Sequence, residues 1–138
     1  MSNSDNKAII TAIMGELARG NARPFVEAMA ENFTWRPMGG SRLGKWREAY
    51  EGKRSVRRDL LAPLMSQFRG EFTSTPSQIL AEGDHVVVET QGAATTKAGH
   101  AYNNRYCLVI RMAGGQMVEV REYLDTALAD AVLEPISA

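Results

Sequence analysis

The segment from Glu71 to Leu124 limits the fold most, because it contains four stretches in which apolar and polar residues alternate. Such alternation predicts strands with one buried and one polar face. The predicted strands cover residues 71–80, 86–94, 102–112 and 116–124. Their connections, "AEGDH", "TTKAGH" and "AGG", are short enough to join antiparallel neighbours. The second half of the chain is therefore predicted to be a meandering antiparallel sheet.

The first half of the chain has helical periodicity instead. Apolar spacing predicts a helix from about Ser4 to Arg19, a short second helix in "RPFVEAMAE" and a third that begins near Lys53. Pro63 lies inside the third pattern and is expected to kink or break that helix. "FTWRP" is expected to be a brief strand, and the glycine-rich "MGGSRLGKW" the most mobile loop. Helices followed by antiparallel strands predict a single α+β domain spanning residues 1–138, with the helices on one side of a curved sheet.

Composition narrows the classes of function. The 138 residues carry a net charge of zero, which gives the whole molecule no electrostatic attraction to nucleic acid. No apolar run approaches the roughly 20 residues that span a bilayer, and no secretory signal is visible. A single cysteine, Cys107, excludes an internal disulfide and a cysteine-based zinc site. We therefore expect a cytoplasmic protein with no nucleic-acid or membrane partner.

Basic residues gather between positions 36 and 58, where only two carboxylates oppose them. Such a cluster could steer an anionic ligand, but a solvated loop and helix face is the commoner explanation. We adopt the solvated surface as the expectation. The basic residues are Arg36, Arg42, Lys45, Arg47, Lys53, Arg54, Arg57 and Arg58.

The last predicted strand, "VEVREYLD", contains a residue that breaks its own pattern. Val118, Val120 and Leu124 form its apolar face, and Glu122 falls on that same face. A glutamate in an apolar cavity would have a raised pKa, which suits general acid/base catalysis near neutral pH. The alternative is a buried acid that hydrogen-bonds a structural donor.

Three stretches carry a resemblance to a known family: "AENFTWRPMG", "YEGKRSV" and "YNNRYCLVIRMAGGQMVEVREYLDT". They are similar to the nuclear transport factor 2-like superfamily, and more narrowly to its SnoaL-like branch, which is related to polyketide cyclases and ketosteroid isomerases. The resemblance implies a cone: three N-terminal helices packed on a strongly curved, mostly antiparallel sheet that encloses a pocket. It implies cofactor-independent isomerase, cyclase or hydrolase-like chemistry on a small apolar carbonyl- or hydroxyl-bearing compound, or non-catalytic binding of one. A protein-interaction module is a weaker third possibility.

The known catalytic sets of related enzymes are incomplete here. Limonene-epoxide hydrolases have a similar last strand, with Glu122 at the place of a catalytic carboxylate. Thr90 and Gly92 stand where those enzymes have an arginine and a second aspartate, and Trp35 and Pro37 where they have a tyrosine and an asparagine. The resemblance therefore does not extend to epoxide hydrolysis.

Ketosteroid isomerases of this fold carry their base aspartate where this sequence has Pro37. Ile13 and Cys107 stand in place of their oxyanion-binding tyrosine and aspartate. Neither known catalytic set is therefore expected in this chain.

Asn104, Tyr106 and Val120 have the same inward parity as Glu122, and Thr90 could donate to it. The resemblance implies that the first strand, with Trp35, faces the cavity and that the third helix, with Leu60 and Leu64, forms a wall of it. These residues would bind substrate oxygens or form the walls of the pocket, or they would simply satisfy Glu122 and fill the core. The predicted substrate-binding residues are Trp35, Leu60, Leu64, Thr90, Asn104, Tyr106 and Val120, with Glu122 as the catalytic residue.

Charged residues on the opposite face of the sheet suggest an assembly. Arg105, Glu119, Arg121 and Tyr123 share the outward parity, and the resemblance implies a homodimer through that face.

His85 and His100 fall at predicted turns, and no spacing of His or carboxylates suggests a metal. We therefore expect neither a metal nor a cofactor.

Overall fold

The fold was analysed in a computed structural model, which describes residues 2–136. The first half of the chain contains α1 (Asn3–Ala18), α2 (Arg23–Glu27), β1 (Met29–Met38), β2 (Tyr50–Glu51), α3 (Lys53–Ser55), the π-helical segment η1 (Val56–Leu61) and α4 (Ala62–Met65). The second half contains β3 (Phe68–Glu82), β4 (His85–Thr96), β5 (Arg105–Ala113), β6 (Gln116–Leu124) and α5 (Thr126–Val132). This element order confirms the predicted α+β class.

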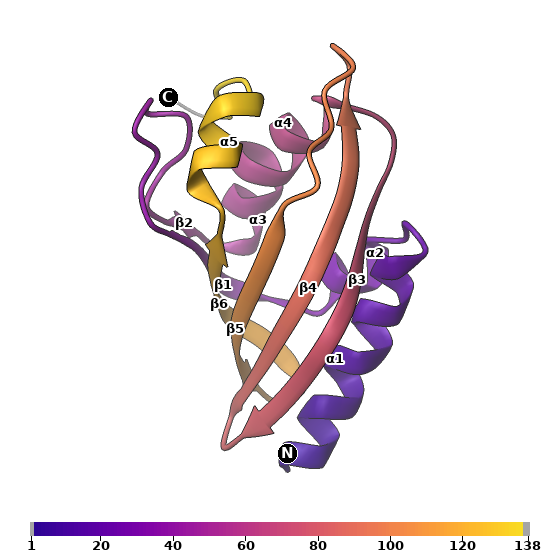
Figure 1. The fold of residues 1–138 in the computed structure, drawn as a ribbon. Helices are drawn as coiled ribbons and strands as arrows, with labels where there is room; N and C mark the ends of the chain where they lie inside the picture. The colour runs from indigo at the N-terminus through magenta and orange to yellow at the C-terminus, as the bar shows by residue number, and fades with distance from the viewer. Residues whose placement is uncertain (1, 137–138) are drawn as a thin grey trace.

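The strands form a single curved and unclosed sheet in the order β2-β1-β6-β5-β4-β3 (Figure 1). The meander β3-β4-β5-β6 is antiparallel, as predicted from its short turns. The added strand β1 pairs in parallel with β6, which places Trp35 opposite Val120 and Pro37 opposite Glu122. Residues about 85 positions apart in the chain therefore meet at the candidate site.

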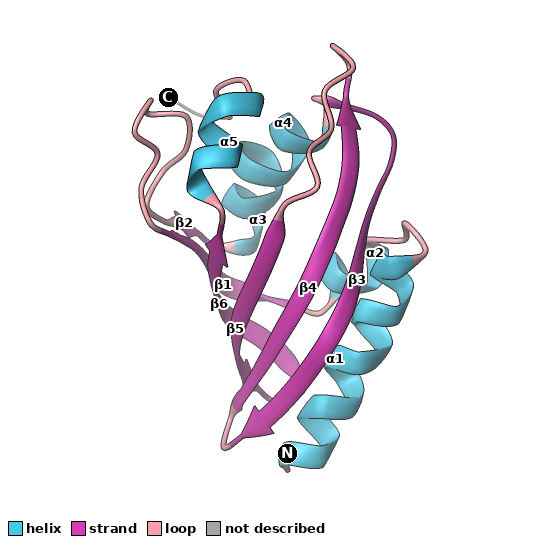
Figure 2. Cartoon of the chain, viewed as in Figure 1, coloured by secondary structure: helices cyan, strands magenta, loops and turns pink. Residues whose placement is uncertain are grey.

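The helices cover one side of the sheet (Figure 2). Apolar side chains from both layers form one core cluster between them. Helix α1 packs along β3 and contributes Ile10 and Met14, both fully buried. A second, smaller cluster joins α5 to the other end of the sheet, where Phe68 stacks on Tyr102 at 5.7 Å between ring centroids. The large core cluster includes Phe33, Val86, Val88, Ile110, Met117 and Val120.

The third predicted helix is continuous through Pro63, because its middle is wound as a π-helix. The Ala62 amide donates to the Arg57 carbonyl five residues earlier, which widens the turn just before the proline. Pro63 then lies in the first turn of α4, where its missing N–H is tolerated. The widened turn thus replaces the predicted break and turns Leu60 and Leu61 towards the sheet.

The glycine-rich loop after β1 is tied to α5. Ser41 Oγ donates to Asp130 Oδ1 (2.5 Å), and the Arg42 amide donates to Asp130 Oδ2 (2.9 Å). Lys45 Nζ donates to the carbonyls of Asp130 and Leu133. These contacts do not fit the expectation that this loop is the most mobile segment.

Candidate active site

A cavity of about 200 Å³ lies between the inner face of the sheet, α2 and the helical segment from η1 to α4. Most of its wall is aliphatic or aromatic, with polar groups on the sheet side. The lining residues are Leu17, Ala22, Phe25, Val26, Trp35, Leu60, Leu61, Leu64, Met65, Phe72, Ser74, Thr90, Tyr106, Leu108 and Glu122. An apolar hollow with a few convergent polar groups is the usual form of a small-molecule site.

Glu122 occupies the inner face of β6, as its parity in the sequence predicted. Its cross-strand neighbours are Leu108 on β5 and Pro37 on β1. Trp35 Nε1 donates a hydrogen bond to Glu122 Oε1 at 3.2 Å, and no other described side chain donates to this carboxylate. Rings of Phe25 and Phe33 hold the indole, at 5.8 and 6.2 Å between centroids.

The environment of Glu122 changes its ionisation. Removal from water disfavours the charged form and raises the pKa of Glu122 from 4.5 to about 7, although the hydrogen bond from Trp35 opposes this. Protein surrounds the carboxyl group, and the accessible part of the side chain lines the cavity. Near neutral pH this carboxyl group can therefore both accept and donate a proton.

Hydroxyl groups form the rest of the polar wall. Ser74 and Thr90 share a buried hydrogen bond of 2.6 Å between their oxygens. The Tyr102 hydroxyl accepts from Asn104 Nδ2 at 3.0 Å and interacts with the hydroxyl of Tyr106. Burial raises the pKa of Tyr102 to about 12 and that of Tyr106 still further, so both phenols are neutral near pH 7.

Gly92 leaves room for the ring of Tyr106. A Cβ atom at this position would lie 2.9 Å from Tyr106 Cε2 and 3.2 Å from the Asn104 carbonyl oxygen. The backbone of β4 therefore approaches the phenol more closely than any larger residue would allow. Glycine at this point sets the position of Tyr106 in the wall.

The structure gathers most of the predicted site residues around this one cavity. Trp35, Leu60, Leu64, Thr90, Tyr106 and Glu122 all line it.

Asn104 and Val120 do not line the cavity, which corrects their predicted placement. The Asn104 side-chain oxygen accepts from the amides of Arg105 (2.8 Å) and Asp125 (3.0 Å), so it joins the start of β5 to the end of β6. Val120 is fully buried in the core cluster.

Part of the cavity wall was not predicted from the sequence. Phe72 and Ser74 belong to the predicted strand 71–80, and the alternation that identified Glu122 would have placed both on its inner face. Phe25 and Val26 come from the short α2. No local signal marks these two, because their position depends on how α2 packs.

Residues 2–136 contain neither a group of metal ligands nor a membrane-spanning helix. In that range, no three His, Cys, Asp or Glu side chains are grouped so that they could hold a metal ion. No helix there is long and apolar enough to cross a membrane. The thiol of Cys107 has a pKa raised by burial and then by the charge of Glu89, which disfavours a reactive thiolate.

Solved structures share this fold at low sequence identity. Bal32a from a soil-derived mobile gene cassette superposes with a TM-score of 0.79 at 18% identity, covering 96% of this chain and 98% of its own. A protein from Jannaschia sp. CCS1 described as a SnoaL-like polyketide cyclase gives 0.73 at 21% identity, covering 99% and 94%. An LEH-like epoxide hydrolase of M. tuberculosis gives 0.69 at 18% identity, covering 91% and 86%.

Sequence comparison gives the family. No curated protein matches the sequence significantly. The family model described as SnoaL-like domain matches residues 10–120, which include Trp35, Thr90 and Tyr106 of the cavity wall. The chain therefore belongs to the SnoaL-like domain family of the nuclear transport factor 2-like superfamily.

Proposed function

We propose that this protein is a cofactor-independent acid/base enzyme in which Glu122 moves a proton on a small, largely apolar carbonyl- or hydroxyl-bearing compound. The observation that carries this proposal is a carboxyl group with a pKa of about 7 on the wall of an apolar cavity. Paired structural carboxylates usually have lowered pKa values, whereas general bases are held near the working pH. The isomerase and cyclase chemistry of the wider family is consistent with this role.

The wall of the cavity supplies the parts of a proton transfer. Ionised Glu122 accepts a proton from a carbon next to a carbonyl group, and the electron pair of the broken C–H bond moves to the carbonyl oxygen. Neutral Glu122 then returns the proton to a different carbon of a conjugated enolate, which gives an isomer. For ring closure, the enolate carbon instead attacks a second carbonyl carbon of the same compound, and the oxygen of that carbonyl takes the proton from Glu122. Ser74, Thr90 and Tyr106 bring hydroxyl groups to the cavity wall, and whichever of Ser74 and Thr90 accepts the bond between them keeps its own proton for the developing oxyanion.

Two features favour this reaction over epoxide hydrolysis. Related epoxide hydrolases combine the carboxylate with an arginine and a second acid, and here those places hold Thr90 and Gly92. Among residues 2–136, Glu122 is also the only acidic residue that lines the cavity. One carboxyl group is sufficient to shuttle a proton between two carbons, whereas activation of water and epoxide opening needs both a base and an acid.

Hydrogen–deuterium exchange at carbon tests the proposal without a known substrate. Small cyclic and aromatic ketones and 1,3-diketones are incubated with the enzyme in D₂O, and exchange of the α-hydrogens is followed by NMR. Glu122→Gln should slow enzyme-dependent exchange by about 10²- to 10⁴-fold, because the amide cannot accept the proton. Glu119→Gln, on the outer face of the same strand, is the matched control and should leave the rate unchanged.

The same assay gives the pH dependence. Exchange should increase with pH through about 7 and then level off, because the ionised form of Glu122 is the base. Exchange that is independent of Glu122 for every ketone that binds would contradict the proposal.

Non-catalytic binding is the second candidate, and the sparse surroundings of Glu122 favour it. Trp35 is its single hydrogen-bond donor among the described residues, and no second acid lines the cavity. Native mass spectrometry of the freshly purified protein distinguishes the two. A tightly held compound that neither exchanges nor changes on incubation would favour a binding protein.

We also propose a homodimer through the outer face of β4, β5 and β6. Tyr123 is 43% exposed there, next to half-buried Cys107 and Val109. Arg121 lies opposite Val109, and Glu119 bridges Arg36 (3.0 Å) and Arg121 (3.5 Å). Light scattering should give twice the 15.2 kDa chain mass, and Tyr123→Glu should shift it towards the monomer. A monomer mass at micromolar concentration would contradict this assembly.

A further inference from the structure

A second hollow adjoins the cavity. It is an open groove of about 760 Å³ between α2, the start of β1 and the helical segment 53–62. Val26 and Leu61 line both hollows, so these two half-buried side chains form their common wall. The polar lining of the groove is very different from that of the cavity, with the cations Lys53, Arg54, Arg57 and Arg58 and the single carboxylate of Glu31.

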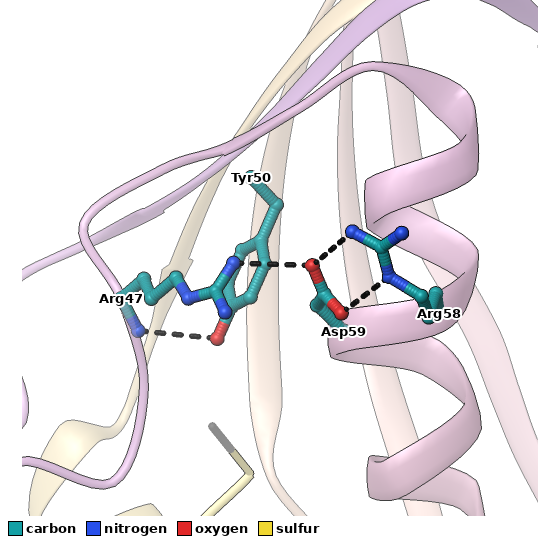
Figure 3. A network of polar contacts seen from close by, with 4 residues as sticks. All are labelled: Arg47, Tyr50, Arg58 and Asp59. Carbon is teal, nitrogen blue, oxygen red and sulfur yellow. Dashed lines mark hydrogen bonds and ion pairs between the residues drawn. The ribbon is translucent and has the colours of Figure 1, made fainter. Parts of the chain in front are cut away.

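Of the cations that line the groove, only Arg58 forms an ion pair with Asp59 (Figure 3). Arg58 binds it through Nε and Nη2 at 2.8 and 3.1 Å, and Arg47 Nη1 reaches it at 3.2 Å. The guanidinium of Arg47 also lies 5.3 Å from the ring centre of Tyr50. Asp59 therefore balances two arginines outside the cavity, and the network fixes Arg58 at the far side of the groove.

The other cations of the groove have no such partner. Lys53, Arg54 and Arg57 form no ion pair with any described carboxylate, and both arginines are exposed. Arg54 and Arg57 line the groove, Leu60 of the same helical segment lines the cavity, and Leu61 lines both. An anion in the groove would meet charges that the protein leaves unpaired.

The cavity alone is smaller than most ligand pockets. Ligand pockets usually measure about 300–1,000 Å³, so a cavity of about 200 Å³ holds only part of a typical ligand. A larger molecule with its apolar part against Glu122 would have to pass Val26 and Leu61 to reach the groove. The part that leaves the cavity would then lie beside Arg54 and Arg57.

We propose that the ligand of this protein is an amphipathic anion, with its apolar body in the cavity and a carboxylate, sulfonate or phosphate group in the groove near Arg54 and Arg57. This inference rests on the proposed function, because it assigns a substrate class to the same cavity. It replaces the expectation that the basic segment is only a solvated surface. It also explains how a mostly apolar cavity selects an orientation, since the anionic end fixes which carbon of the ligand lies at Glu122.

A matched pair of fluorescent probes tests the inference. 8-Anilinonaphthalene-1-sulfonate and N-phenyl-1-naphthylamine share an apolar body and differ by one sulfonate. The sulfonate should bind the wild-type protein about tenfold or more tightly than the neutral probe, and its affinity should fall as salt is raised. Each probe should displace the other, because both use the cavity.

Charge substitutions locate the anion. The double variant Arg54→Gln/Arg57→Gln should weaken the sulfonate probe about tenfold and change the neutral probe less than about twofold. Lys7→Gln/Arg69→Gln removes the same charge from exposed positions that line neither hollow, and it should change neither probe by more than about twofold. Melting curves of both double variants confirm that they fold.

The outcomes separate this inference from the proposed function. Equal loss of the sulfonate probe in both double variants, or no loss in either, would overturn the anion site while the neutral probe still reports a working cavity. Failure of both probes to bind would overturn the inference together with the ligand cavity. Loss of proton exchange in Glu122→Gln with unchanged sulfonate binding would support both.

Discussion

Two carboxylates of this protein, Glu122 and Asp130, are placed in opposite surroundings. Asp130 accepts hydrogen bonds from Ser41 Oγ and the Arg42 amide, and Lys45 lies close by. These donors, Ser41 first, lower the pKa of Asp130. Glu122 has one donor, Trp35, and burial raises its pKa to about 7.

The hydrogen-bond donors around a carboxyl group, rather than the residue type, decide whether it stays charged at neutral pH. Asp130 remains ionised and ties a loop to α5, so its charge is used for structure. Glu122 stays close to the point where it gains or loses a proton, so its charge is available for chemistry. Replacing each acid by its amide should therefore have opposite consequences.

Asp130→Asn should give the largest effect. The amide group keeps one acceptor oxygen and presents an N–H donor to either Ser41 Oγ or the Arg42 amide, so the loop loses one of these two hydrogen bonds and the attraction between the charge of Asp130 and Lys45. We expect the Tm at pH 7 to fall by about 5–10 °C. Differential scanning calorimetry measures this, and an unchanged Tm would mean that the loop does not depend on Asp130.

Glu122→Gln should stabilise the fold at high pH. The carboxyl group titrates near 4.5 when unfolded and near 7 when folded, so the wild-type folded state binds more protons in this window and loses stability as the pH rises through it. At pH 8 the variant should be more stable by about 1–3 kcal/mol, and at pH 4 the gain should vanish. Urea unfolding at both pH values checks the sign, and a variant that is less stable at pH 8 would assign Glu122 a structural role.

Gly92→Ala tests the polar wall that faces Glu122. The added methyl group would overlap the ring of Tyr106 and the Asn104 carbonyl, so we expect a loss of about 1–2 kcal/mol and a displaced phenol. Gly15→Ala is the control, because nothing lies within 4 Å of its Cβ position in α1. The control should gain up to about 1 kcal/mol from helix propensity. Equal effects of the two substitutions would argue against a tight Tyr106 site.

Trp35→Phe should give the smallest effect, and it tests most directly how a hydrogen-bond donor changes the pKa of Glu122. It removes the one donor to Glu122 and keeps an aromatic ring beside Phe25 and Phe33. Because that hydrogen bond lowers the pKa of Glu122, its loss should move the midpoint of the exchange rate above 7, by less than about one pH unit. A midpoint that moves downwards would mean that the indole does not stabilise the ionised form.

Much of the fold could be predicted because its signals are local. Strand β6 begins and ends at the predicted residues, Gln116 and Leu124, and the short turns gave the antiparallel meander. The parallel pairing of β1 with β6 has no local signature, since it joins segments about 85 residues apart. Strand β5 begins at Arg105 instead of the predicted Tyr102, and at that point the Asn104 side chain accepts from the Arg105 amide.

Part of the candidate site could also be predicted, because the parity of residues along a strand is a local signal. Parity along one strand identified Glu122, and parity on neighbouring strands identified Thr90 and Tyr106. Contributions from packing, such as Phe25 and Val26 of α2, could not be read from the sequence. The single-donor environment of Glu122 also depends on Trp35, which reaches it only through the long-range β1–β6 pairing.

The pKa of Glu122 is the quantity on which the account depends most directly. Carboxyl carbons can be labelled with ¹³C in all glutamates and followed by NMR from pH 3 to pH 9, with the Glu122→Gln spectrum assigning the resonance. We predict that this signal titrates with a midpoint near 7, well above the value of about 4.3 that is usual for a glutamate in water. A midpoint for Glu122 near 4.5 would contradict the account, because the carboxyl group would then be a permanently charged residue at neutral pH.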